Sequence, residues 1–256
     1  MDALSPSWTA LGVTGSALGV RSMILDSLKL NWDSITPTFL PSILERTLPG
    51  NLVPLVGSLD LEALLSILEN EGTALGTVPS TPIAATLLDA DSEGDRRAIL
   101  GRRLPTIIDD CDEVAHRITT GPLASAAQHL SQALAAARSG HPEAAQALLG
   151  NVLDTALRRV WTKRERDLRT SRAEKNSPTT ERFMEDTLPQ AVALLPVWAA
   201  YAPYQSDKNG LIPHRFNRHA TAHSAGSRRQ YNRRNTAQAA LVASSVLAYL
   251  HAEARV

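Results

Sequence analysis

The sequence predicts an all-α protein, and three observations support that fold class. Alanine and leucine dominate the apolar residues, whereas aromatic residues make up 4% of the chain, a composition that favours helices over sheet. Apolar residues recur at helical spacing in several segments, and no alternating apolar pattern is long enough to build a sheet. A length of 256 residues allows two parts, so we expect an N-terminal helical region at 1–118 and a bundle of four to five helices at 119–256.

The N-terminal region reads as short helices joined by turns. In SLDLEALLSILENEG the leucines recur at i, i+3, i+4 and i+7, and Gly72 is the expected C-cap. The next helix is expected to have Thr81 as its N-cap and Pro82 in its first helical position. The helix predicted over 104–118 places six apolar residues on one face: Leu104, Ile107, Ile108, Cys111, Ala115 and Ile118.

The turn TTGP at 119–122 marks the boundary, and the helices beyond it are longer and richer in alanine. We predict helices over 123–139, from Pro142 into the charged segment 162–175, over about 182–204 and over 227–252. Pro189 and Pro196 are expected to start or kink parts of the third of these helices. Small residues in the last helix, such as Ala237, Ala240 and Ser244, predict close helix packing and therefore a tight bundle.

A formal net charge of zero hides a strong segregation of charge along the chain. From Lys208 to Ala252, a segment that we call the basic window, there are seven basic side chains and no acidic one. The rest of the chain holds 19 basic and 26 acidic side chains. Such a window points to a polyanionic partner or to an acidic mate within the chain. The candidate mate is the acidic run Asp109, Asp110, Asp112 and Glu113, which otherwise reads as a solvated helix face.

Several classes of site and location are not expected. Cys111 is the only cysteine, so one chain can form neither a disulfide nor a thiolate metal site. No basic region precedes the mildly apolar N-terminal stretch, and no apolar run approaches the roughly 18 residues of a membrane span. We therefore expect a cytoplasmic protein without membrane contact, and we expect no cofactor.

The segment RFNRHATAHS at 215–224 carries the candidate catalytic residues. Arg218 and His223 form the chain's only Arg-to-His pair with four to six intervening residues. A guanidinium can hold a phosphodiester through two charge-assisted hydrogen bonds and stabilise its transition state. An imidazole, with an ordinary pKa of about 6.5, can transfer a proton at neutral pH. Together they would suffice for RNA cleavage by attack of a 2′-OH on the neighbouring phosphate, without a metal.

The spacing of this pair restricts where the motif lies. Residues five apart on one straight helix point about 140° apart around its axis, so a single helix would not aim both at one phosphate. We therefore expect the motif to lie where the chain enters the last helix, near Gly226. A second protomer could also complete the site across a symmetric interface.

Over roughly 122–252 the sequence resembles the HEPN superfamily. The resemblance rests on NRHATAH, on the tyrosine in RRQYNRRNTAQAAL and on the early helix GHPEAAQALLGNVLDTALRR. It implies a helical bundle that pairs into a homodimer, and a metal-independent ribonuclease of the toxin, phage-defence or RNA-processing kind. It also implies that Arg218 and His223 are the catalytic pair, with Asn217, His219 and Tyr231 as supporting residues.

One position departs from the pattern of the family. HEPN toxins that an adenylylating nucleotidyltransferase silences usually carry a tyrosine two residues after the histidine, and this chain has Ala225 there. Tyr231 is the candidate substitute. The resemblance to toxins makes an antitoxin or another regulatory protein a candidate partner. Ala225 argues against control of this chain by adenylylation.

Other interpretations of the same residues stay open. Arg215, Arg228, Arg229, Arg233 and Arg234 are candidate RNA contacts, or else a solvated face. Arg218 and His223 would be structural in a non-catalytic HEPN-like module that binds RNA or protein. His219 and His223, with His214 nearby, would bind zinc only with a ligand from elsewhere in the fold. A last alternative is a scaffold in which the acidic run docks on the basic window.

Overall fold

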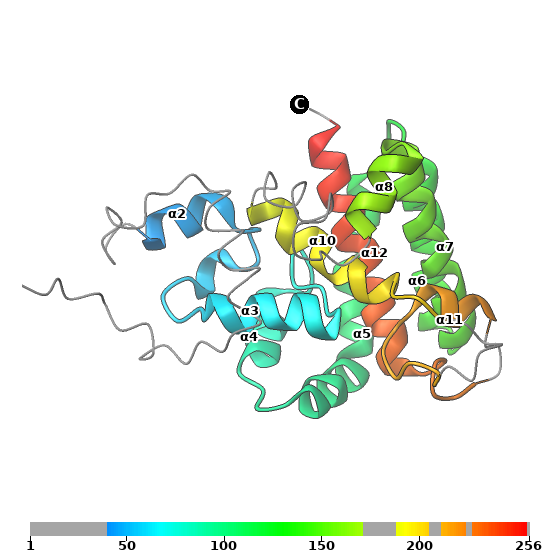
Figure 1. Ribbon diagram of the computed structural model, residues 1–256, viewed down its shortest axis with the longest axis horizontal. Helices are drawn as coiled ribbons and strands as arrows, with labels where there is room; N and C mark the ends of the chain where they lie inside the picture. Colours follow the sequence, from blue (N-terminus) through cyan, green and yellow to red (C-terminus); the bar gives the residue numbers. More distant parts are fainter. Residues whose placement is uncertain (1–39, 171–187, 205–210, 224–226, 255–256) are drawn as a thin grey trace, which may run out of the picture.

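The computed structural model describes residues 40–170, 188–204, 211–223 and 227–254, and these residues form helices and no strand (Figure 1). The predicted all-α class is confirmed. None of the described helices is both long enough and apolar enough to cross a membrane. Gly226 and residues 182–187 of a predicted helix lie outside the described residues.

The first helices are short and end at turns. In order they are α2 (Leu40–Thr47), the 3-10 turn η3 (Val53–Leu55), α3 (Leu61–Ser66), the π-helical turn η4 (Ile67–Glu71) and α4 (Thr81–Leu88). Gly72 ends η4 with φ 66°, which confirms the predicted C-cap. The predicted cap of α4 is wrong, because the N-cap is Ser80. Thr81 lies inside the helix, and its hydroxyl donates to the carbonyl of Asn51 at 2.8 Å.

Helix α5 (Glu93–Arg117) is longer than the sequence predicts. It begins at Ser92, whose hydroxyl accepts a hydrogen bond from the backbone N–H of Asp95. The six apolar residues predicted to share one face of this helix are all buried, so that prediction is confirmed.

Among the described residues, the acidic run of α5 pairs with neighbours outside the basic window. Asp109 and Asp112 lie 2.9 and 3.2 Å from Nη2 of Arg138, on α6 (Ala124–Arg138). Glu113 pairs within its own helix, and Asp110 accepts a backbone N–H from the start of α4. The acidic run thus links α5 to α6 and to the start of α4, which pack beside it. The predicted docking of the run on the basic window is therefore wrong.

The remaining helices are α7 (Pro142–Val160), α8 (Lys163–Thr170), α10 (Leu188–Ala200), α11 (Arg218–His223) and α12 (Arg233–Glu253). The sequence predicted that the helix from Pro142 continues into the charged segment, and this is wrong, because α7 ends at Val160. Trp161 is extended, and Thr162 starts α8 by a reciprocal pair of hydrogen bonds with Glu165. The last helix begins at Arg233 rather than at Ser227, because the side chain of Asn232 caps it.

Helix α12 is the centre of the molecule. It packs against α5, α7, α10 and α6 (Figure 1). Ala237, Ala240 and Ser244 are buried, as their small size predicted. One hydrophobic core runs from Leu44 to Leu250 and joins helices from both sides of the predicted boundary. That boundary, between 118 and 119, stays a prediction.

Candidate functional site

The candidate motif forms a helix of its own. Arg218 and His223 are the first and last residues of the six-residue helix α11, so the predicted placement at the start of the last helix is wrong. Asn217 accounts for the difference, because its Oδ1 accepts the backbone N–H of Ala220 at 2.8 Å and so caps α11. As the first and last residues of one helix, Arg218 and His223 point about 140° apart around its axis.

Two residues from other parts of the bundle hold Arg218: Asp154 on α7 and Tyr201 directly after α10. Its Nη2 lies 3.2 Å from Oδ2 of Asp154 on α7, and its Cζ lies 5.5 Å from the ring centroid of Tyr201. The Tyr201 hydroxyl donates to the other oxygen of Asp154 at 3.0 Å. The guanidinium therefore has an ordered position, with a cation–π contact beside its ion pair. Its buried Nε has no partner among the described residues.

The two histidines of α11 differ in environment. His223 is exposed. His219 is partly buried and meets Tyr201 edge to face, with ring centroids 6.0 Å apart. Burial lowers the pKa of His219 first, and the charges of Arg218 and His223 lower it further against the opposing effect of Asp154. These effects favour the neutral form of His219, and His223 is the histidine that solvent or a substrate can reach.

The other supporting residues hold α11 against its surroundings. Asn217 Nδ2 donates to the carbonyl of Ala202 at 2.8 Å, which ties α11 to the end of α10. The hydroxyl of Tyr231 donates to the carbonyl of Thr221 at 2.5 Å. Gln146 of α7 donates to the hydroxyl of Thr221 at 3.1 Å. Of the three predicted supports, His219 lies on α11, and Asn217 and Tyr231 bond to it directly.

Sequence reasoning missed Asp154 and Tyr201. The sequence held a signal for Asp154, because it is an acidic residue among the apolar residues of a predicted helix. The structure shows that its side chain is 13% exposed. A carboxylate that is largely buried needs a partner, but its helical periodicity does not say which one.

A zinc site at the histidines of α11 gains no support. Within the ranges that the structure describes, no three His, Cys, Asp or Glu side chains come together in a way that could hold a metal ion. His214, the third histidine of that alternative, instead lies 2.9 Å from Oε1 of Glu93.

Arg215 differs from the other candidate RNA contacts. It makes two hydrogen bonds of 2.7 Å to the two oxygens of Glu93, at the start of α5. Arg215 and, less strongly, His214 lower the pKa of Glu93 to about 2, against burial, which raises it. The charge of Arg215 is therefore already compensated, and the residue fastens the 214–215 segment to α5.

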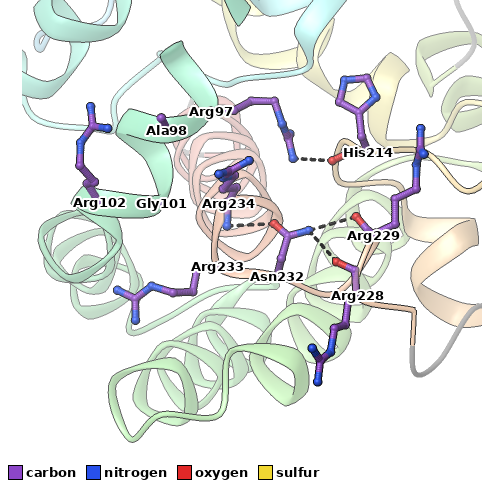
Figure 2. A pocket seen from close by; sticks show the side chains of 10 residues that line it. All are labelled: Arg97, Ala98, Gly101, Arg102, His214, Arg228, Arg229, Asn232, Arg233 and Arg234. Atoms are coloured by element: carbon purple, nitrogen blue, oxygen red, sulfur yellow. Dashed lines mark hydrogen bonds between the residues drawn. The ribbon is translucent and has the colours of Figure 1, made fainter. Parts of the chain in front are cut away.

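The other four predicted RNA contacts lie together. Figure 2 shows Arg228, Arg229, Arg233 and Arg234 around a groove between α5 and the start of α12. We call it the arginine groove; its volume is about 760 Å³, and its remaining lining residues are Arg97, Ala98, Gly101, Arg102, His214 and Asn232. None of the lining residues is acidic.

The described part of the chain thus has two neighbouring features that are rich in basic side chains. One is an ordered arginine and an exposed histidine on α11, and the other is a groove lined by six arginines. The turn that carries Arg228 and Arg229 also carries Tyr231, which bonds to α11. Comparisons with protein-family models, with curated proteins and with solved structures find no match to this chain.

Proposed function

We propose that this protein is a metal-independent endoribonuclease of the HEPN type. The observation that supports it best is α11, which presents the ordered guanidinium of Arg218 and the exposed imidazole of His223 within six residues. The arginine groove beside it offers charge for the rest of an RNA strand. From the resemblance of residues 122–252 to the HEPN superfamily we also infer a toxin or phage-defence effector in the cytoplasm, with an antitoxin or regulatory protein as its partner.

The proposed reaction needs only these two side chains and the RNA. The 2′-oxygen attacks phosphorus and the bond to the 5′-oxygen breaks, which leaves a 2′,3′-cyclic phosphate and a 5′-hydroxyl. Arg218 binds the phosphate oxygens and stabilises their added charge in the transition state. His223 takes the proton of the 2′-OH and, once protonated, gives it to the departing 5′-oxygen, so the proton ends in the 5′-hydroxyl.

The geometry of α11 favours a homodimer as the active form. Because Arg218 and His223 diverge around the axis of α11, one copy does not direct both at one phosphate. A two-fold axis near α11 would bring Arg218 of one copy toward His223 of the partner subunit.

The test is cleavage of a mixed-sequence RNA by the full chain in the presence of EDTA. We expect cyclic-phosphate ends from the wild type, and a loss of at least about 100-fold in Arg218→Ala and in His223→Ala. Matched controls are Arg117→Ala and His129→Ala, which replace exposed residues of α5 and α6 outside the site. Full activity in His223→Ala, or equal losses in the controls, would refute the proposal.

Mixing the two inactive variants tests the composite site. If one copy supplies Arg218 and the other His223, a mixed dimer regains one of its two sites. Random exchange of subunits then restores roughly a quarter of the wild-type rate. No recovery in mixtures that are shown to exchange subunits would place both groups of one site in the same copy.

A second candidate function is a non-catalytic RNA-binding module, and the ion pair between Arg218 and Asp154 favours it. The carboxylate, which Arg218 shares with Arg158, opposes the charge that catalysis would use. In that case the wild type binds RNA without cutting it. The double substitution Arg228→Glu and Arg229→Glu then weakens binding strongly, and His223→Ala does not.

A further inference from the structure

We propose that the arginine groove binds the phosphate backbone of an RNA strand and that α5 forms one wall of it, so that the N-terminal half of the chain is part of the RNA site. This rests on the proposed function for the identity of the ligand. It adds Arg97 and Arg102, which lie outside the basic window, and it leaves out Arg215.

The first support is uncompensated charge. Arg102, Arg228, Arg229 and Arg233 are exposed cations of the groove. No carboxylate of the described ranges forms an ion pair with them or with Arg234, in contrast to the pairing of Arg215 with Glu93. Cations gathered without counter-charges repel one another, and a polyanion relieves that repulsion.

The second support is Arg97, a buried arginine with 9% of its surface exposed. Its Nη2 donates to the backbone carbonyl of His214 and, at 2.9 Å, to Oδ1 of Asn235, and both contacts hold it at the groove. Its Nη1 has no acceptor among the described residues. Burial lowers the pKa of Arg97, and the charges of Arg234 and Arg215 lower it further against the effects of Glu93 and Glu71. A bound anion would offset this unfavourable environment.

The third support is that the groove is built from fixed parts. A Cβ at Gly101 would lie 3.2 Å from Cγ of Arg234, so the glycine lets this arginine lie against α5. Asn232 caps α12 with its Oδ1 and donates from Nδ2 to the carbonyls of Arg228 and Arg229 (Figure 2). The turn that carries the two arginines is therefore attached to the start of α12.

The fourth support is continuity with α11. Arg228 and Arg229 line the groove, whereas Tyr231, two residues further on, bonds to Thr221 of α11. A strand in the groove would thus lie beside the helix that carries His223. Guanidinium groups that contact phosphates carry little sequence information, so we expect binding that tolerates many sequences.

The test measures binding of a 2′-O-methyl RNA, which lacks the attacking hydroxyl, to full-length protein by fluorescence anisotropy. Arg102→Glu is compared with Arg103→Glu, the same charge change at the exposed neighbouring residue of α5 that does not line the groove. We expect Arg102→Glu to weaken binding by roughly three- to tenfold and to reduce the salt slope by about 1, and Arg103→Glu to change binding less than about twofold.

Equal effects of the two substitutions, or none, would overturn the proposal. A second arm adds inorganic tripolyphosphate at constant ionic strength. If tripolyphosphate binds in an Arg102-dependent way and RNA does not compete with it, the groove serves a free phosphate ligand and the proposal fails. Because this RNA cannot be cleaved, its binding is measured independently of cleavage. Binding of the 2′-O-methyl RNA together with no cleavage of unmodified RNA in the EDTA assay would refute the ribonuclease and leave the proposal for the groove standing.

Discussion

Asp154 of α7 holds Arg218 of α11: Oδ2 of the carboxylate lies 3.2 Å from Nη2 of the guanidinium. The Asp154 side chain is 13% exposed and the Arg218 side chain 24%, so water screens the pair only in part. Tyr201 donates to the same carboxylate and lies under the same guanidinium. The pair therefore keeps Arg218 in one position before any phosphate binds, and that phosphate has to compete with Asp154.

We predict that Asp154→Asn lowers both stability and cleavage. The same Oδ2 of Asp154 also lies 2.5 Å from Nε of Arg158, so the amide keeps the shape of the side chain but removes the counter-ion of both arginines, at a cost of about 1–3 kcal/mol. Cleavage should fall by roughly tenfold, because the guanidinium loses its fixed position. Urea unfolding and the EDTA cleavage assay measure the two effects. Glu113→Gln is the control, because it breaks an exposed ion pair on α5 and should cost less than about 0.5 kcal/mol. Unchanged stability in Asp154→Asn would show that the ion pair is unimportant.

We predict that Glu93→Gln destabilises the protein in a pH-dependent way. The pKa of Glu93 is lowered from 4.5 to about 2, so its ionised form stabilises the fold at pH 7. That contribution is present above about pH 4.5 and is lost as the pH falls toward 2. After allowance for solvent screening it amounts to about 1–2 kcal/mol. Urea unfolding at pH 7 and at about pH 3 measures the difference.

The control for Glu93 is Glu143→Gln. Glu143 lies in the first turn of α7, as Glu93 does in α5, so both share the helix-dipole effect. Glu143 is exposed. A difference between wild type and Glu93→Gln that does not shrink at low pH would contradict the prediction. Arg215→Ala should lower stability similarly and change RNA affinity less than Arg228→Ala does.

We predict that Asn217→Ala loosens α11 without unfolding the protein. The substitution removes the cap on the N–H of Ala220 and the donor to the carbonyl of Ala202, a loss of about 1–2 kcal/mol. Amide hydrogen exchange at Ala220 and Thr221 should become faster, and cleavage should fall with it. Asn151→Ala, an exposed asparagine within α7, is the control and should leave exchange in α11 unchanged. Slow exchange at Ala220 in Asn217→Ala would rule out the proposed role of the cap.

Local patterns predicted the helices better than their connections. The six apolar residues predicted over 104–118 are buried and Gly72 ends a helix, because helical periodicity and a left-handed backbone conformation are properties of a short segment. The missed end of α7 and the separate α11 have local causes too, the caps at Thr162 and Asn217. A capping side chain at these positions competes with an uninterrupted helix. A polar residue within a helical pattern does not show whether the helix continues through it or a new helix starts there.

The sequence by itself determined the all-α class, the buried helix faces, and the placing of Arg218 and His223 within one short segment. Only the tertiary structure decided what surrounds them. Packing of α7 and α10 brings Asp154 and Tyr201 to Arg218, and packing of α5 on α12 makes Arg97 and Arg102 neighbours of Arg234. These contacts join residues that are far apart in the chain. Which residues meet depends on how the apolar faces of α5, α7 and α12 pack together in one core, and a local sequence pattern does not contain that information.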